Sequence, residues 1–309
     1  MSDLSVAVVI TTYEPGPTIK ELIRTIMDAG FTPIVVDDGS AAPPASLRGA
    51  EVLHLPDNRG IAAALNAGVE RARRRGATHV ITLDQDSKVG PDFVTRMCEA
   101  WERASDVGLR PAVVAPGQIA GITYRGTRVG SLLAVPEVMQ SGAMFGIEQL
   151  QHTGGFDESL VIDCVDTDMC LRLRSAGWGV VVAPVPVEHE LGRAREVRLG
   201  PRTLLLTRHA PFRDYYMARN RVLMIREHLR NEPRWALGMA RRTLVAVVLT
   251  ALFDEGRWTK VAAMSRGLWD GLRGRRGQLP EQRRQRWNGG ASPAVSAGGD
   301  DQSSDAELR

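Results

Sequence analysis

Two carboxylates separated by one residue, Asp84 and Asp86, follow an apolar segment in the stretch ITLDQDSKVG. If that segment is a strand, alternating side chains place both carboxylates on one face. Like charges held so close repel each other unless a cation neutralises them, and carboxylate oxygens suit Mg²⁺ or Mn²⁺. Such an ion commonly keeps coordination positions for substrate phosphates. The alternative is a surface turn in which Asp86 or Ser87 caps a helix that starts near Pro91.

Two further polar clusters also come directly after apolar segments. Thr11 and Tyr13 end the run VAVVITTY, and Asp37 and Asp38 end the run PIVVDD. Aspartate before Gly-Ser is ordinary turn chemistry, but a carboxylate here could equally accept hydrogen bonds from the base or ribose of a nucleotide. No G-x-G-x-x-G or G-x-x-x-x-G-K-[ST] loop follows the first run, so neither a dinucleotide fold nor a P-loop fits.

The elements that must position these residues alternate between strand and helix. Continuous Val/Ile runs predict strands buried on both faces, and apolar residues at helical spacing predict helices between them. The predicted strands lie in 6–13, 32–37, 50–56 and 78–84, and the predicted helices in 15–30, 60–76 and 91–104. This alternation is typical of βαβ units on a parallel sheet. Ligands of such sheets sit beyond the carboxyl ends of the strands, so the three polar clusters should converge on one crevice.

The pattern loosens after about Pro116. Residues 132–146 suggest strands and a small-residue turn, 164–176 a helix, and 179–189 a further strand that ends at His189. From Pro211 the chain is predicted to be helical, over 212–230 and 234–253. Past about Pro280 it has little to bury and is predicted to be disordered.

The composition is that of a soluble globular protein of one or two domains, with 309 residues, 43% hydrophobic and 24% charged. The net charge of +3 is too balanced to indicate nucleic acid as the main partner, although residues 273–286 are locally basic. Three cysteines without a C-x-x-C pair indicate buried thiols in a reducing cytoplasm. The N-terminus lacks the basic region of a signal peptide. The longest apolar run, 244–253, is shorter than the ~20 residues that cross a membrane.

Several ordered motifs between about Val6 and Arg226 resemble those of the family 2 glycosyltransferases, enzymes with a GT-A nucleotide-sugar fold. They are VVITTYEP, VVDDGS, DNRGIAAALNAG, LDQDS, SGAMF, GGFDESLVIDCVDTDMCLRLRSAGW and EHELG. The versions NRGIAAALNAG, IDCVDTDMCLR and APFRDYYMARNR are most similar to the branch that uses dTDP-L-rhamnose to build cell-surface polysaccharide.

The resemblance implies a role for each motif. The family's catalytic base maps onto Asp166, which would take the proton from an acceptor hydroxyl while that oxygen attacks C1 of the sugar. Many relatives have Glu-Asp where this chain has Val165-Asp166, and Asp163 could supply the second acid. His189 could complete the metal site, since imidazole suits Mn²⁺, or be a hydrogen-bonded structural residue. The implied residues are Asp84, Asp86 and His189 for Mg²⁺ or Mn²⁺; Thr11, Tyr13, Asp37, Asp38, Asn58, Arg59, Gly60, Asp84 and Gln85 for the donor; and Ser141, Gly142, Asp163 and Asp166 for the acceptor.

The resemblance also implies an α/β architecture of the GT-A type, a Rossmann-like, mostly parallel sheet flanked by helices, with a C-terminal helical extension. We expect a nucleotide-sugar-binding half in 1–117, an acceptor-binding half of the same domain in 118–200, a helical region in 201–280 and a disordered tail in 281–309. The expected activity is inverting, metal-dependent transfer of L-rhamnose from dTDP-L-rhamnose, or of another sugar from a UDP- or GDP-sugar. The acceptor would be a glycan or a polyprenyl-linked glycan, in the cytoplasm or at the inner face of the membrane.

Alternatives remain open for several residues. Asp166 could be a first-turn acid stabilised by the helix dipole, and Asp168 a helix-surface residue paired with Arg172. Arg219 and Arg221 could reach the diphosphate or the acceptor, or could face solvent.

The C-terminal helix and the function also have rival interpretations. Residues 235–253, with Arg241 and Arg242, could bind anionic lipids of the inner leaflet, or could be buried in a helical bundle or a homo-oligomer interface. A nucleotidyltransferase would normally need a Gly-rich phosphate loop, which TTYEPGP resembles poorly. A catalytically silent nucleotide-sugar-binding scaffold is the rival outside enzymes, and the intact D-x-D and Asp166 argue against it.

Overall fold

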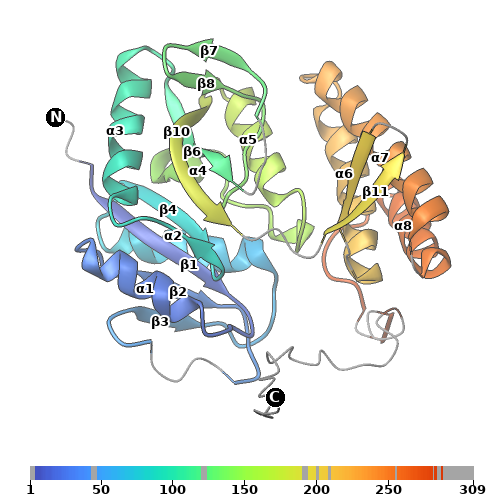
Figure 1. Ribbon diagram of the computed structural model, residues 1–309, viewed down its shortest axis with the longest axis horizontal. Coiled ribbons are helices and arrows are strands. Elements are labelled where there is room, and N and C mark those ends of the chain that lie inside the picture. The colour runs from blue at the N-terminus through green and yellow to red at the C-terminus, as the bar shows by residue number, and fades with distance from the viewer. Residues whose placement is uncertain are drawn as a thin grey trace, which may run out of the picture.

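Parallel strands joined by helices build the N-terminal half of the fold (Figure 1). The computed structural model describes residues 4–42, 47–119, 124–189, 194–199, 202–207, 210–254, 256–280, 282–283 and 287. Its first four strands pair in parallel in the order β3-β2-β1-β4. They are β1 (Val6–Thr12), β2 (Ile34–Asp37), β3 (Glu51–His54) and β4 (His79–Asp84). The helices that join them or follow them are α1 (Ile19–Asp28), α2 (Ile61–Arg74) and α3 (Phe93–Asp106). The predicted βαβ alternation is therefore confirmed.

A short antiparallel strand makes the sheet mixed. β9 (Met144–Gly146) lies between β4 and β6 (Pro111–Ile119) and pairs antiparallel with both. Beyond β6 the sheet continues through β10 (Gly179–His189), which is parallel to β6. The remaining strands are short or peripheral: β5 (Ser87–Lys88), β7 (Thr127–Val129), β8 (Leu132–Ala134) and the separate hairpin of β11 (Ala194–Leu199) and β12 (Arg202–Thr207). The sequence predicted no strand at β6 or at the hairpin.

Helices cover both faces of the sheet, as the alternation of apolar side chains along β1 requires. Val8 and Ile10 face a core cluster that includes α1 and α3. Val9 faces the opposite cluster, which α2 shares with two later helices, α4 (Ile147–His152) and α5 (Val165–Ser175). A single turn of 3-10 helix, η1 (Glu158–Leu160), precedes α5.

Three C-terminal helices form a layer beside α5 (Figure 1). They are α6 (Pro211–His228), α7 (Pro233–Phe253) and α8 (Arg257–Leu272), which confirms the helices predicted after Pro211. α8 packs closely on α6 because Gly267 has no side chain, and a Cβ there would lie 2.3 Å from the carbonyl oxygen of Tyr215. The predicted disordered tail, 281–309, lies almost entirely outside the described residues.

The two halves of α7 differ in their surroundings. Trp235, Ala236 and Met239 belong to the main core, whereas none of residues 244–253 is buried. At 21 residues, α7 is long and apolar enough to cross a membrane by length and composition alone. The uninterrupted apolar run in the sequence, 244–253, is shorter than the helix because Arg241 and Arg242 precede it within α7.

Candidate active site

The Asp84–Asp86 turn is held in place by serine hydroxyls. Asp84 is the last residue of β4, and its backbone N–H lies 3.2 Å from the hydroxyl oxygens of both Ser87 and Ser141. Ser87 begins β5, and the N-cap residue of α3 is Asp92, so neither Asp86 nor Ser87 caps that helix. The capping alternative is therefore wrong. Asp86 is exposed and Asp84 is half-buried, so the pair lies near the surface at the carboxyl end of β4.

The strand β9 brings the SGAMF motif against the same turn. The N–H of Gly142 donates to the carbonyl oxygen of Thr82, at 2.7 Å, and Ser141 is buried. Gln140, one residue earlier, donates its side-chain amide to the Asp84 carboxylate at 2.6 Å. Ser141 and Gly142, predicted as acceptor-binding, thus lie beneath the Asp84 turn and support it.

The backbone of His189 lies beside the same turn. In the antiparallel pairing of β10 with β5, His189 is the register partner of Ser87, which directly follows Asp86. The structure describes the backbone of His189 and not its side chain. The fold thus brings the backbone of His189 close in space to Asp84 and Asp86, the two other predicted metal-binding positions.

The end of β1 joins the Asp84 turn through Gln85. Thr11 is the register partner of Asp84, and Thr12 is that of Asp37 in β2. The side-chain oxygen of Gln85 accepts hydrogen bonds from the Thr12 hydroxyl, at 2.6 Å, and from the N–H of Tyr13, at 2.9 Å. The predicted convergence of the polar clusters at the carboxyl ends of β1, β2 and β4 is therefore observed.

Both aspartates of VVDDGS have protein partners. Asp37 is fully buried; it accepts hydrogen bonds from Ser40, and Nδ1 of His54 lies 2.6 Å from its carboxylate. Asp38 accepts hydrogen bonds of 2.8 Å from the N–H groups of Arg59 and Gly60. Burial raises the pKa of Asp38, and these two N–H groups oppose the rise. Asp38 therefore shapes the loop at 58–60, and Asp37 joins the end of β2 to His54 of β3.

The loop at 58–60 in turn contacts the segment that leads to Asp166. Arg59 forms an ion pair of 2.6 Å with Glu158, and Asn66 bonds both the N–H and the carbonyl of Phe156. Gly60 has φ +94°, and a Cβ there would lie 2.3 Å from the carbonyl oxygen of Val161. The loop at 58–60, with its predicted donor residues, thus packs against residues 156–161, the segment that precedes Asp163 and Asp166.

Buried side chains of α6 fix the loop before α5. Asn220 donates to the carbonyl oxygens of Leu160, Ile162 and Asp163 at 2.8–2.9 Å. Arg219 is buried, and donates to the carbonyls of Ser159 and Leu160. Arg219 therefore neither faces solvent nor reaches out toward a substrate, because these carbonyls occupy it. Backbone strain explains the need for such support, since Val161, Asp163 and Cys164 all have φ above +60°.

Asp166 lies in the first turn of α5, with further acids around it. Its carboxylate accepts the N–H of Thr167 at 2.8 Å. Burial raises its pKa to about 6; the Thr167 N–H opposes the rise, and the negative charges of Glu137 and Asp163 add to it. A carboxylate with this pKa is deprotonated at neutral pH and can still accept a proton readily.

The two neighbouring acids are held by residues that the sequence did not single out for this purpose. Asp163 forms an ion pair of 3.1 Å with Arg213. Glu137 accepts a hydrogen bond of 3.0 Å from the Thr167 hydroxyl and lies 3.5 Å from Arg242 of α7. Glu137 and Asp166 are 29 positions apart, and no local motif connects them.

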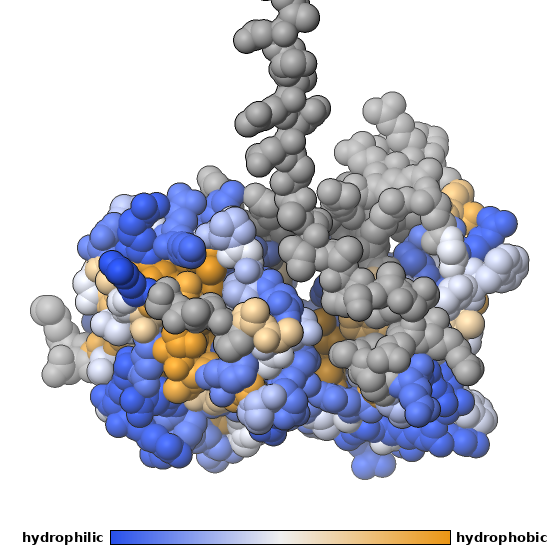
Figure 2. Space-filling view, turned by 90° about the horizontal axis from the view of Figure 1, so that it is seen from below, coloured by the Kyte–Doolittle hydropathy of each residue, from blue (hydrophilic) through white to orange (hydrophobic). Residues whose placement is uncertain are grey.

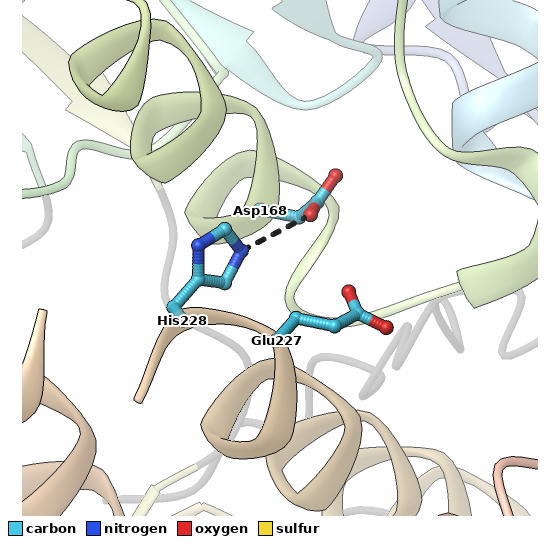
Figure 3. Close-up of side chains that lie close together, drawn as sticks. All are labelled: Asp168, Glu227 and His228. Atoms are coloured by element: carbon cyan, nitrogen blue, oxygen red, sulfur yellow. Dashed lines mark ion pairs between the residues drawn. The ribbon is translucent and has the colours of Figure 1, made fainter. Parts of the chain in front are cut away.

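Asp168 joins α5 to α6 and is not at the helix surface. It is buried and forms an ion pair of 2.6 Å with Arg172, as the i, i+4 spacing suggested. Figure 3 shows Asp168 facing the ring of His228, 3.6 Å away, while the Glu227 carboxylate points away from that ring. The three residues are close enough together to hold a metal ion. Arg172 already pairs with Asp168, and Arg276 with Glu227, so the cluster is better explained as an ion-paired joint between helices.

Two known enzymes are similar in sequence to this chain. The chain is 26% identical to the dTDP-rhamnosyl transferase RfbF of Shigella flexneri, over 86% of this chain and 95% of that protein. It is 23% identical to the polyprenol monophosphomannose synthase of Mycolicibacterium smegmatis, over 60% of this chain and 78% of that protein.

Solved structures share the fold at low sequence identity. A GalNAc-T7 crystal structure with UDP, GalNAc and Mn²⁺ has a TM-score of 0.51 and 14% identity, over 61% of this chain and 44% of that chain. Staphylococcus aureus TarS has a TM-score of 0.51 and 16% identity, over 90% of this chain and 50% of that chain. The chain thus spans half or less of these solved chains. Residues 7–153, just under half of the chain, match the model of glycosyl transferase family 2, so the chain contains a family 2 glycosyltransferase domain.

Proposed function

We propose that this glycosyltransferase moves L-rhamnose from dTDP-L-rhamnose onto a hydroxyl of a glycan or a polyprenyl-linked glycan, with inversion at C1. The observation that carries the proposal is Asp166, an acid with a raised pKa at the family's base position, in the first turn of α5 directly after a loop that buried side chains fix. Similarity to RfbF over most of both chains supports the rhamnosyl donor. Similarity to a polyprenol monophosphomannose synthase supports a lipid-linked acceptor.

The donor would lie beyond the carboxyl ends of β1, β2 and β4. Thr11, Tyr13 and the loop at 58–60 would contact the nucleotide, with Asp37 beside them and Asp38 fixing the shape of that loop. We further propose that residues 1–117 form the donor half and 118–200 the acceptor half, and that the enzyme works in the cytoplasm or at the inner face of the membrane.

The carboxylates of the Asp84 turn have the chemistry of a divalent-cation site. Two hard oxygen ligands, one half-buried and one exposed, lie beside the backbone of His189. Asp84, Asp86 and His189 would hold Mg²⁺ or Mn²⁺, which would supply positive charge to the departing diphosphate. A solved structure with the same fold contains Mn²⁺, which supports this assignment.

Asp166 would supply the proton acceptor. Its carboxylate takes the proton of the acceptor hydroxyl as that oxygen forms a bond to C1 and the bond from C1 to the diphosphate breaks. Positive charge develops on the sugar ring in the transition state, as in glycoside hydrolysis. The negative charges of Asp163 and Glu137 favour the protonated form of Asp166, and so help it to hold the proton.

A panel of nucleotide sugars tests donor and class together. Purified protein with Mg²⁺ or Mn²⁺ is expected to release dTDP from dTDP-L-rhamnose in preference to UDP from UDP-sugars or GDP from GDP-sugars. EDTA should stop the release, and added Mn²⁺ should restore it. Turnover of a UDP- or GDP-sugar instead would overturn the rhamnose assignment, and neither binding nor turnover of any donor would favour a scaffold.

Removing the charge of Glu137 should shift the pH dependence of transfer. A base must be deprotonated, so kcat/KM should fall as the pH drops through about 6, the pKa of Asp166. Glu137 raises that pKa, so Glu137→Gln should move the acidic limb of the profile to lower pH and preserve activity there. The amide still accepts a hydrogen bond from Thr167, so the change is chiefly one of charge.

A pH–rate profile of kcat/KM measures this shift. Glu148→Gln removes an equivalent charge from an exposed position in the first turn of α4 and serves as the matched control, with no shift expected. If the Glu137→Gln limb stayed where it is in the wild type, either Glu137 does not influence the base or Asp166 is not the base.

A further inference from the structure

The helix α7 exposes apolar side chains along one stripe, and most of them lie in its second half. Leu237 is 73% exposed, Leu244 65% and Leu252 59%, and Val245 and Val248 lie between them. These spacings return to the same side of a helix. We call these five residues, together with Trp258 at the start of α8, the apolar face; Trp258 is 74% exposed. Scattered apolar residues are ordinary on protein surfaces, but five exposed apolar residues on one side of a helix indicate an interaction surface.

Arginines accompany the exposed tryptophans of α8. The guanidinium of Arg257 lies 5.6 Å from the ring centre of Trp258, and that of Arg273 lies 4.3 Å from the ring centre of Trp269. Tryptophan is enriched at the boundary between hydrocarbon and water, since its ring is apolar and its N–H is polar. In Figure 2, hydrophobic residues show at the outer edge of the right-hand lobe, the lobe that contains α7 and α8 in Figure 1.

The charge of this region is opposite to that of the rest of the chain. Residues 230–276 contain ten Lys or Arg and four Asp or Glu, a net charge of +6. The whole chain carries +3, so the remaining residues carry −3. An apolar stripe within a positively charged region matches a surface that is both apolar and anionic, which is the composition of an acidic lipid bilayer.

We propose that the apolar face of α7 and α8 docks this protein on an anionic lipid bilayer, as a peripheral contact. A second copy of the chain fits less well, because two surfaces of the same positive charge repel each other. Membrane spanning fits less well too. Trp235, Ala236 and Met239 in the first half of α7 pack in the protein core, and Arg242, in mid-helix, contacts Glu137 in the segment after β8. Because Glu137 is close to Asp166, the contact of Arg242 with Glu137 places α7 near the proposed base. A lipid-linked acceptor in the bilayer would therefore lie on the same side of the protein as Asp166.

Flotation with lipid vesicles tests the proposal without any sugar substrate, so its outcome is independent of the proposed transfer reaction. The full chain should float with vesicles of phosphatidylcholine and phosphatidylglycerol in equal amounts and stay behind with phosphatidylcholine alone. Binding should weaken as salt screens the charges. The combined variant Leu244→Ser, Val248→Ser and Leu252→Ser should reduce the partition coefficient at least about tenfold.

Matched controls separate docking from loss of folding. Met27→Ser with Val107→Ser removes exposed apolar side chains elsewhere, at 40% and 52% exposure, and should leave flotation unchanged. Thermal unfolding of both variants should match the wild type, since none of these side chains is buried. Equal flotation of the triple variant and the wild type would overturn the proposal. So would a lipid-free dimer that the triple variant dissociates, or wild-type protein that resists extraction with alkaline carbonate, which would indicate a spanning helix.

Discussion

Replacing Asp166 with asparagine should abolish sugar transfer while leaving donor binding nearly unchanged. Asparagine keeps the size and the hydrogen-bond acceptor of the side chain but cannot take a proton from the acceptor hydroxyl. General-base catalysis contributes about 10²- to 10⁴-fold to a rate, so kcat should fall by at least about 100-fold. The loop before α5 should keep its shape, because Asn220 and Arg219 donate to its backbone carbonyls, which the substitution does not change.

Two measurements separate this effect from misfolding. Nucleotide affinity, from calorimetry with dTDP and Mn²⁺, should stay within about threefold of the wild type, since ~0.7 kcal/mol is the most that a change remote from the nucleotide should cost. The same substitution at Asp106, an exposed residue at the end of α3, is the matched control and should leave both transfer and affinity unchanged. Full transfer activity in Asp166→Asn would contradict the assignment of the base, and Asp163 would then be the next residue to test.

The convergence of Thr11, Asp37 and Asp84 could be predicted because it depends on local patterns. Continuous apolar runs and helical spacing identify strands and helices over short windows, and their alternation dictates a parallel sheet. In a parallel sheet the residues after each strand share one edge, so three motifs far apart in sequence meet without any knowledge of tertiary contacts. The register of Thr11 with Asp84 and of Thr12 with Asp37 is what that reasoning requires.

The roles of Asp37 and Arg219 could not be predicted, because burial depends on contacts distant in sequence. Asp37 is fully buried with His54 of β3 as a partner, and Arg219 bonds carbonyls some 60 positions earlier in the chain. A charged residue in a motif suggests a ligand contact, yet a buried charge with several partners serves the fold equally well.

The charged residues around Asp166 could not be predicted from the sequence either. Glu137 lies near Asp166 because the segment after β8 passes beside α5, where Glu137 accepts a hydrogen bond from Thr167. Arg242 contacts Glu137 because α7 packs beside that segment. The strands suggested over 132–146 include β9, but its antiparallel place between β4 and β6, which puts Ser141 under Asp84, has no local signal in the sequence. Short segments and isolated charges acquire their roles from topology.

Replacing Asp84 with asparagine should impair transfer in a different way from Asp166→Asn. The amide is a weaker ligand for Mg²⁺ or Mn²⁺ than a carboxylate, and the proposed site would lose one negative charge. Stabilisation of the departing diphosphate by the cation amounts to several kcal/mol, so kcat should fall at least about 100-fold. The affinity for dTDP in the presence of Mn²⁺ should fall as well, whereas Asp166→Asn leaves it unchanged.

Metal titration distinguishes loss of the site from collapse of the turn. Asp84 also accepts a hydrogen bond from Gln140, so the turn could change shape when its carboxylate is replaced. Asp86→Asn provides the comparison, because Asp86 is exposed and the serine contacts of the turn are made by Asp84, Ser87 and Ser141. Both variants should need a higher Mn²⁺ concentration for half-maximal activity, and excess Mn²⁺ should restore part of the rate. Wild-type activity in both variants, unaffected by EDTA, would show that Asp84 and Asp86 hold no cation. Their role would then be to form the turn after β4.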